Sequence, residues 1–297
     1  MTGATRGIGL AIAQELARQG LRVIVAGRDA PLGVKVAGEL GGRACFQMLD
    51  VTDDGSIAAI AASLQGAGGL DVLVNNAGAS FDGFDASVAR RTLDVNFAGM
   101  MRLTDRLLPL LHRDARVVMV SSGMGDVSIL GAALRAEVMK PQLDRAQLAA
   151  FTDRFVADVA AGTHTKSGWP SNAYRVSKIA MNAYVRILGR ELLDDPRKIL
   201  VNAAGANAHA AAVAGRTRRR GSAASGGDRS LHALHAGAVV ASSVHRTGQG
   251  GPALAPGNDV VRIGTSKLIT YAVPPLSHWA TPRSLPLHMR PVGSTTA

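Results

Sequence analysis

The sequence predicts an α/β fold with a doubly wound parallel sheet. Two observations carry this prediction. Short apolar runs rich in β-branched residues alternate with helical patterns over residues 1–204, and a glycine-rich turn comes directly before the first helical pattern. Strands that alternate with helices form parallel sheets with helices on both faces, joined by right-handed crossovers.

The expected elements follow one another in a regular order. Apolar runs predict strands at 21–26, 44–49, 72–74, 117–120 and 199–201. Helical periodicity predicts helices at 7–20, 32–40, 54–64, 87–111 and 171–193. We therefore expect one domain over residues 1–204 and treat residues 205–297 separately.

Composition excludes several classes of protein. Hydrophobic residues make up 47% and charged residues 19%, which is typical of a globular chain. A single cysteine, Cys45, excludes a disulfide framework and a Cys₂ or Cys₄ metal site; we expect no bound metal. No apolar run approaches the roughly 18 residues of a membrane span, and no signal peptide is recognisable. We expect a cytoplasmic protein without a membrane partner.

The net charge of +11 comes mainly from residues 205–297, which hold 10 Lys and Arg against 2 Asp and Glu. This segment is rich in Ala, Arg, Gly and Ser, with one strand-like stretch at Val260–Val273. We expect a basic, low-complexity tail that is poorly ordered. Its arginine run, Arg216–Arg220, has no interleaved aromatic residues, so a nucleic-acid partner is not expected.

The glycine-rich turn is a candidate phosphate site. Glycines at this spacing let backbone N–H groups approach a pyrophosphate at a helix N-terminus. An ordinary tight turn is the alternative, but the following helix and strand favour a dinucleotide. The candidate cofactor-binding residues here are Gly3, Thr5, Arg6, Gly7, Ile8 and Gly9.

The second expected strand ends at Gly27-Arg28. A fold that prefers NAD usually has an acidic residue at this point to hold the ribose 2′-OH, which Gly27 cannot do. Arg28 and Arg6 can instead pair with a 2′-phosphate, although both could simply be solvated. The sequence therefore favours NADP(H) over NAD(H).

Two further segments follow strands at the expected ligand edge of the sheet. Asp50-Val51 comes after one strand, and Asn76-Ala77-Gly78 after the next. The carboxyl ends of parallel strands face the ligand crevice, so we expect these residues to contact the cofactor.

A Tyr and a Lys four residues apart, Tyr174 and Lys178, lie on one face of an expected helix. A nearby cation lowers the pKa of a phenol from about 10, which makes Tyr a usable acid or base. Ser121-Ser122 ends a strand and supplies a hydroxyl.

Together, TGATRGIG, NNAG, Asn96, VSS and YRVSK occur in the order found in the short-chain dehydrogenase/reductase family, which this chain resembles. The resemblance implies a Rossmann-like fold. It also implies that Tyr174 protonates a carbonyl oxygen and that Lys178 holds the nicotinamide ribose. Ser122 would polarise the carbonyl, with Ser121 as the alternative, and Asn96 would hold a water in a proton relay.

The spacing between Ser122 and Tyr174 resembles that of the carbonyl reductase branch, which has an insertion here, at about residues 124–169. In that branch the insertion covers the surface used for tetramers, so the resemblance implies a monomer. We expect helices in the insertion, most clearly over Asp144–Ala160. Trp169 either borders the substrate site or packs in the core.

Two departures from the family weaken the prediction of activity. Only Met1 precedes Thr2, where the family has a central strand, which suggests truncation or a late start. The resemblance stops near Asn202-Ala203, where the family continues with a loop over the nicotinamide and further elements. A shifted reading frame or a divergent tail would explain this.

The sequence therefore predicts an NADPH-dependent reductase of a small aldehyde, ketone or quinone. The alternative is a non-catalytic remnant that binds nucleotide weakly or not at all.

Overall fold

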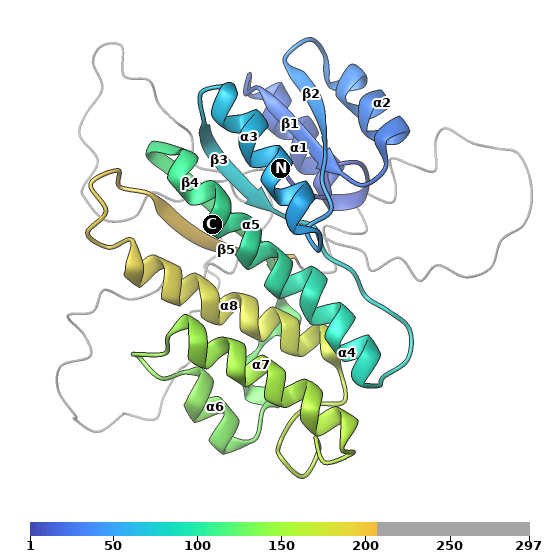
Figure 1. Cartoon of the computed structure of the whole chain (residues 1–297), viewed down its shortest axis with the longest axis vertical. Coiled ribbons are helices and arrows are strands. Elements are labelled where there is room, and N and C mark those ends of the chain that lie inside the picture. Colours follow the sequence, from blue (N-terminus) through green and yellow to red (C-terminus); the bar gives the residue numbers. More distant parts are fainter. Residues whose placement is uncertain (207–297) are drawn as a thin grey trace, which may run out of the picture.

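The computed structural model describes residues 1–206 (Figure 1). The expected tail from residue 207 onward, with Val260–Val273 and the arginine run, lies outside the described residues. The strands are β1 (Val23–Gly27), β2 (Ala44–Met48), β3 (Leu70–Asn75), β4 (Leu111–Ser122) and β5 (Leu200–Ala206). The helices are α1 (Gly7–Arg18), α2 (Ala30–Leu40), α3 (Asp54–Gly66), α4 (Ala86–Leu93), α5 (Gly99–Leu107), α6 (Ala132–Val138), α7 (Arg145–Ala160) and α8 (Ala173–Glu191).

All paired strands of the described chain run parallel. β1 pairs with β2, and β4 pairs with both β3 and β5. Residues Met1–Ala4 join the two groups: Thr2 N donates to Val74 O (3.0 Å) and Ala26 N donates to Met1 O (3.0 Å). The order across the sheet is therefore β2, β1, the Met1–Ala4 segment, β3, β4 and β5. The Met1–Ala4 segment lies beside the carboxyl ends of β1 and β3.

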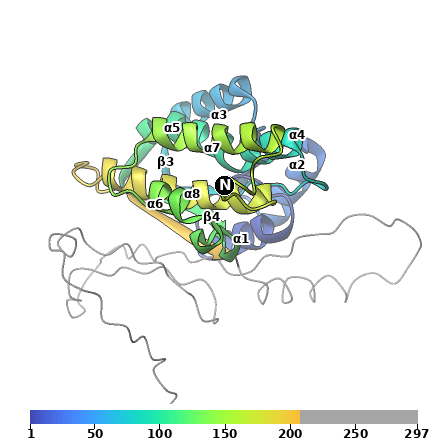
Figure 2. The same cartoon turned by 90° about the horizontal axis from the view of Figure 1, so that it is seen from below.

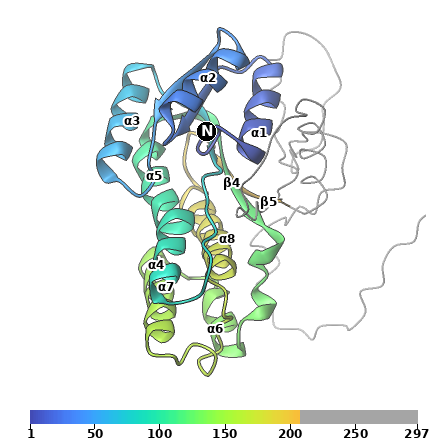
Figure 3. The ribbon, with the colours of Figure 1, turned by 90° about the vertical axis from the view of Figure 1, so that its right-hand side faces the viewer.

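Alternate side chains of the strands point to opposite faces of the sheet and pack in two separate hydrophobic cores. Val74, Val118 and Val120 pack with α1 and α2 on one face, while Leu73 and Met119 pack with α3, α5 and α8 on the other. Figures 2 and 3 show α1 and α3 on opposite sides of the sheet. The predicted doubly wound α/β fold is confirmed.

The prediction of a single helix over 87–111 is wrong in detail. α4 is followed by a π-helical turn, Asp94–Ala98, before α5 begins at Gly99. β4 then starts at Leu111, well before the expected 117, through a polar segment in which its register with β3 shifts. A π turn adds one residue to a helical turn and frequently marks a functional site.

The insertion forms α6 and α7, which pack beyond α8 at the lower end of the molecule (Figure 1). Trp169 is buried and contacts Phe151 edge-on, with ring centres 4.6 Å apart. Its indole N–H donates to Asp158 Oδ2 (2.8 Å). These contacts support the packing role for Trp169.

An ionic network also ties α7 to its neighbours. Arg145 bonds Glu191 Oε2 (2.6 Å) of α8 and Asp105 Oδ1 (2.5 Å) of α5. The Tyr184 hydroxyl donates to the same Asp105 oxygen (2.8 Å). Arg145 thus links the insertion to α5 and α8, while α7 packs on α4 and α8.

Candidate active site

The glycine-rich turn and the segment after β3 are bonded directly to each other. The Thr2 hydroxyl accepts from Asn76 N (3.0 Å) and Ala77 N (2.8 Å). The Asn76 side-chain amide donates to the carbonyl oxygens of Thr2 and Gly3, both at 3.0 Å. These bonds bring two sequence-predicted segments together and set the shape of the turn.

The N-terminus of α1 lacks the cap that other helices have. Its preceding residue, Arg6, makes no side-chain capping bond, whereas α2, α3, α4, α7 and α8 are capped by the side chains of Asp29, Asp53, Asp85, Asp144 and Asn172. A Cβ on Gly7, where φ is +58°, would meet no atom within 4 Å. The start of α1 therefore has no side-chain cap and has free space beside Gly7, both of which a pyrophosphate site requires.

Gly9 is needed for a different reason. A Cβ there would lie 2.1 Å from Gly3 O and 2.5 Å from Asn76 Nδ2. The helix consequently packs backbone-to-backbone against the turn, and only glycine fits. Ile8 and Thr5 are half-buried beside it, and Thr5 Cγ2 would lie 3.3 Å from a Cβ on Gly27.

The charged groups expected near the ribose lie together at the ends of β1 and β2. Arg28 Nη1 is 3.9 Å from Asp50 Oδ2, and the Arg28 side chain is 70% exposed. Asp50 Oδ1 accepts from the Thr52 hydroxyl at 2.7 Å, so this carboxylate is already engaged. Arg28 keeps free donors that can reach an anionic group. Val51 is buried, with its carbonyl against Gly99 of α5.

Tyr174, Ser122 and Lys178 meet at the end of β4. The Ser122 side chain lies close enough to the Tyr174 phenol to lower its pKa, and Lys178 Nζ lies 5.5 Å from the centre of the Tyr174 ring. Lys178 Nζ donates to Val120 O (2.8 Å). Ser121 points elsewhere, because its hydroxyl donates to Asn182 Oδ1 (2.6 Å) and it is buried. The geometry therefore favours Ser122 over Ser121.

The expected lowering of the Tyr174 pKa is wrong for this arrangement. Burial raises the pKa of Tyr174 above 10, and the hydrogen bond with Ser122 offsets only part of that rise. Burial also lowers the pKa of Lys178 to about 8. Sequence spacing placed the two groups together correctly, but it could not weigh desolvation against their attraction. Tyr174 is consequently protonated at neutral pH, the state that a proton donor needs.

Asn96 lies in the π-helical turn and is fully buried. Its Oδ1 accepts from Ala79 N (2.7 Å), and its Nδ2 donates to Ala79 O (2.8 Å) and Ser177 Oγ (3.1 Å). Ser177 in turn donates to Tyr174 O (2.7 Å). Asn96 thus joins the segment after Gly78 to the turn of α8 that carries Tyr174. Both of its N–H groups are used in these bonds, so only an Oδ1 lone pair remains for the expected water.

Sequence reasoning assigned no role to Thr2, Ser177 or Asn182. Thr2 and Ser177 lie inside the quoted motifs, so their hydroxyls were a visible signal. No feature of the sequence pointed to Asn182, because its hydrogen-bond partners lie on β4 and on the loop after it.

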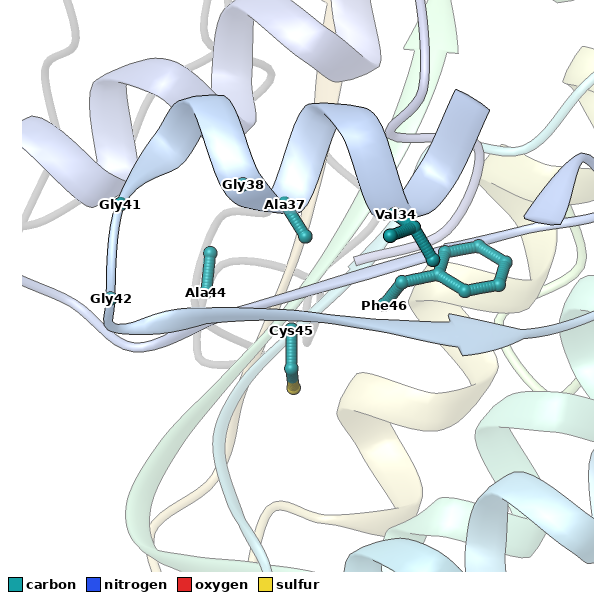
Figure 4. Close-up of a pocket in the computed structure, with 8 residues that line it drawn as sticks. All are labelled: Val34, Ala37, Gly38, Gly41, Gly42, Ala44, Cys45 and Phe46. Atoms are coloured by element: carbon teal, nitrogen blue, oxygen red, sulfur yellow. The ribbon is translucent and has the colours of Figure 1, made fainter. Parts of the chain in front are cut away.

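A hollow between α2 and β2 has a volume of about 440 Å³ (Figure 4). It is lined mainly by glycine and apolar residues, and Cys45 points away from α2 (Figure 4). It lies at the outer strand of the sheet, away from the carboxyl ends where the predicted residues gather.

The described residues contain no cluster of three or more His, Cys, Asp or Glu suited to a metal ion. None of their helices is long and apolar enough to cross a membrane.

Comparison with known proteins agrees with this geometry. The family described as short chain dehydrogenase matches residues 1–134. Carbonyl reductase (NADPH) 1 of Rattus norvegicus is 35% identical over 216 residues, covering 68% of this chain and 78% of the relative. The chain belongs to the short-chain dehydrogenase/reductase family.

Other members place this short-chain dehydrogenase/reductase in the carbonyl reductase-like branch. Carbonyl reductase (NADPH) 3 of Homo sapiens is 36% identical, with the same coverage of both chains. Salutaridine reductase from Papaver somniferum matches in structure with a TM-score of 0.63 and 25% identity, over 69% of this chain and 84% of that one. Menthone neomenthol reductase from Mentha piperita gives 0.63 and 27%, over 69% and 87%.

Proposed function

We propose that this protein reduces the carbonyl group of a small aldehyde, ketone or quinone to an alcohol, with NADPH as the reductant. The observation that carries the proposal is the meeting of Tyr174, Ser122 and Lys178 at the carboxyl end of β4, the edge of the sheet at which α1 also begins, without a side-chain cap. The curated relatives are named for carbonyl reduction with NADPH, which supports the substrate class and the cofactor.

The residues present fit such a cofactor. The N–H groups at the start of α1 would hold the pyrophosphate. Arg28, and Arg6 at the same edge, would pair with the 2′-phosphate, and Asn76-Ala77-Gly78 and Asp50-Val51 would border the nucleotide. When bound, the reduced nicotinamide supplies the hydride.

Tyr174 and Ser122 act on the substrate oxygen. The Ser122 hydroxyl donates to the carbonyl oxygen, orienting and polarising the group. The Tyr174 phenol gives its proton to that oxygen as negative charge develops there. Lys178, close to the phenol, stabilises the phenolate that remains and holds the ribose. Asn96 would hold a relay water through the free lone pair of its Oδ1.

We further infer that the protein is cytoplasmic and monomeric. The inference of a monomer rests on α7, which packs on α4 and α8 and bonds α5 and α8 through Arg145. Sedimentation measures the oligomeric state directly. A stable dimer or tetramer would contradict this inference.

The test of function is NADPH oxidation with a panel of carbonyl compounds, comparing the wild type with Tyr174→Phe. We expect the variant to lose about 10²–10⁴-fold in kcat, the usual contribution of a general acid. Equal rates would refute the role of Tyr174. Saturable NADPH binding by fluorescence distinguishes an enzyme from the alternative, a remnant that binds nucleotide weakly or not at all.

A further inference from the structure

Asn182 is a polar residue of α8 that makes two bonds to the segment around Ser122. It lies one helical turn after Lys178. Its Oδ1 accepts from Ser121 Oγ (2.6 Å), and its Nδ2 donates to Gly125 O (3.3 Å). One side chain therefore connects α8 both to the end of β4 and to the loop that follows.

The two partners of Asn182 lie on either side of Ser122. Ser122 itself caps the short 3₁₀ turn Gly123–Gly125 by accepting from Met124 N (3.1 Å). The segment is thus attached to α8 before and after Ser122. These two attachments fix the backbone around Ser122, and with it the position of the Ser122 side chain relative to Tyr174.

The loop also rests directly on the helix. A Cβ on Gly125 would lie 2.7 Å from Asn182 Nδ2 and 3.0 Å from Lys178 O. The loop therefore contacts both the Asn182 side chain and the helix backbone at Lys178. A change in the Asn182 amide would therefore move the loop itself.

We propose that Asn182 is a positioning residue that holds Ser122 opposite Tyr174. The proposal rests on the proposed function for its catalytic meaning, but its geometry stands on the bonds themselves. Ser121 is 3% exposed, so loss of its acceptor leaves a buried hydroxyl without a partner and favours rearrangement of the strand end. The bond from Lys178 to Val120 O and the backbone pairing of Ser121 and Ser122 with β5 remain, so we expect a displacement of the Ser122 side chain and of the loop after it rather than loss of the strand.

A shifted Ser122 would be detectable at Tyr174. Among the described residues, the charged group found near this phenol is Lys178, on the same helix. Lys178 is not hydrogen-bonded to the Asn182 side chain. Loss of the Ser122 hydrogen bond should therefore raise the pKa of Tyr174 further without changing its charged surroundings.

The test uses Asn182→Leu, which preserves the approximate volume and removes both bonds. The chain has three tyrosines, Tyr174, Tyr184 and Tyr271, so subtraction of the Tyr174→Phe titration isolates the phenol of interest in ultraviolet absorbance. We expect Asn182→Leu to move this titration to higher pH. We also expect kcat to fall about tenfold to a hundredfold, the cost of a misplacement near 1 Å, with KM for NADPH unchanged.

A double variant distinguishes positioning from general weakening. In a Ser122→Ala background, Asn182→Leu should give no further shift of the Tyr174 titration, because the bond it protects is already gone. An unchanged titration in folded Asn182→Leu protein, or a full additional shift in the double variant, would overturn the proposal. If Asn182→Leu does not fold, the same titration is measured on Ser121→Ala, which removes the bond between Ser121 and Asn182 from the other side.

The matched control is Thr152→Val, which removes a buried hydroxyl of α7 whose bond goes to Ala149 O of the same helix. We expect its Tyr174 titration and its kcat to match the wild type. The titration needs no turnover. If the wild type reduces no carbonyl but the Tyr174 titration still responds to Asn182→Leu, the proposed function fails and the positioning role stands.

Discussion

Replacement of Asn96 by leucine tests how firmly the π-helical turn is attached to the site. Leucine has a similar volume, so the change removes hydrogen bonds with little effect on packing. Three bonds are lost: two with the backbone of Ala79 and one with Ser177. All three join segments that are far apart in sequence.

The magnitude follows from that count. A typical buried hydrogen bond contributes about 1 kcal/mol net, so three give about 3 kcal/mol. Ala79 is only half-buried, so water can reach its freed N–H and C=O groups, and we add no further penalty for them. For a domain of this size, 3 kcal/mol corresponds to a fall in Tm of about 6–12 °C.

The assay is urea unfolding followed by circular dichroism, with Ser177→Ala as the comparison. That variant keeps both bonds between Asn96 and Ala79, so its free energy of unfolding should fall by only about 1–2 kcal/mol. A loss below about 1 kcal/mol for Asn96→Leu, or a loss no larger than that of Ser177→Ala, would refute the reasoning.

Three further changes test other parts of the structure. Gly9→Ala places a Cβ 2.1 Å from Gly3 O, so NADPH affinity should fall at least tenfold; unchanged affinity by fluorescence titration would contradict the backbone contact. Arg28→Ala should reduce the preference for NADPH over NADH, measured as the ratio of kcat/KM values; an unchanged ratio would remove Arg28 from the 2′-phosphate site. The ring nitrogens of His112 bond Asp71 Oδ1 (2.9 Å) and Gly68 O (2.6 Å), which raises the pKa of His112 above 6.5. Its stabilising effect is complete below pH about 6.5 and is lost as pH rises through the folded pKa. His112→Asn should therefore be less stable than the wild type at pH 6 and should approach it at higher pH; a stability difference independent of pH would exclude this role.

The sequence predicted the strands well where their side chains are buried. Four of the five expected strands overlap the observed ones to within a few residues, because apolar β-branched runs mark a sheet covered on both faces. β4 was found only in its second half. Its first residues are polar and largely exposed, and the register with β3 shifts there. No alternation of apolar and polar residues marks this part in the sequence.

The site was predictable where its residues are adjacent along the chain, and much less so elsewhere. The four-residue spacing placed Tyr174 and Lys178 on one helical face, which the structure bears out. The π-helical turn at Asn96 could not be predicted from the sequence, since one extra residue in a helical turn barely changes the apolar periodicity. The bond from Ser121 to Asn182 spans 61 residues, and only the folded chain brings the two together.

The polar groups of α8 explain why this helix has one definite position against β4. Ser177, Lys178 and Asn182 lie on the same side of α8 as Tyr174, because residues three, four and eight positions on lie within about 80° of it around an α-helix. The remaining buried side chains of α8 are mostly apolar, and apolar contacts tolerate small sliding or rotation because they have no direction. The polar groups instead bond specific atoms on the π-helical turn, on β4 or on the loop after it. A rotation of α8 by one residue would break these bonds between elements, and each buried group left without a partner would cost about 1–3 kcal/mol. The apolar majority of the helix therefore supplies most of its stability, while the polar face sets its register and, with it, the distance between Ser122 and Tyr174.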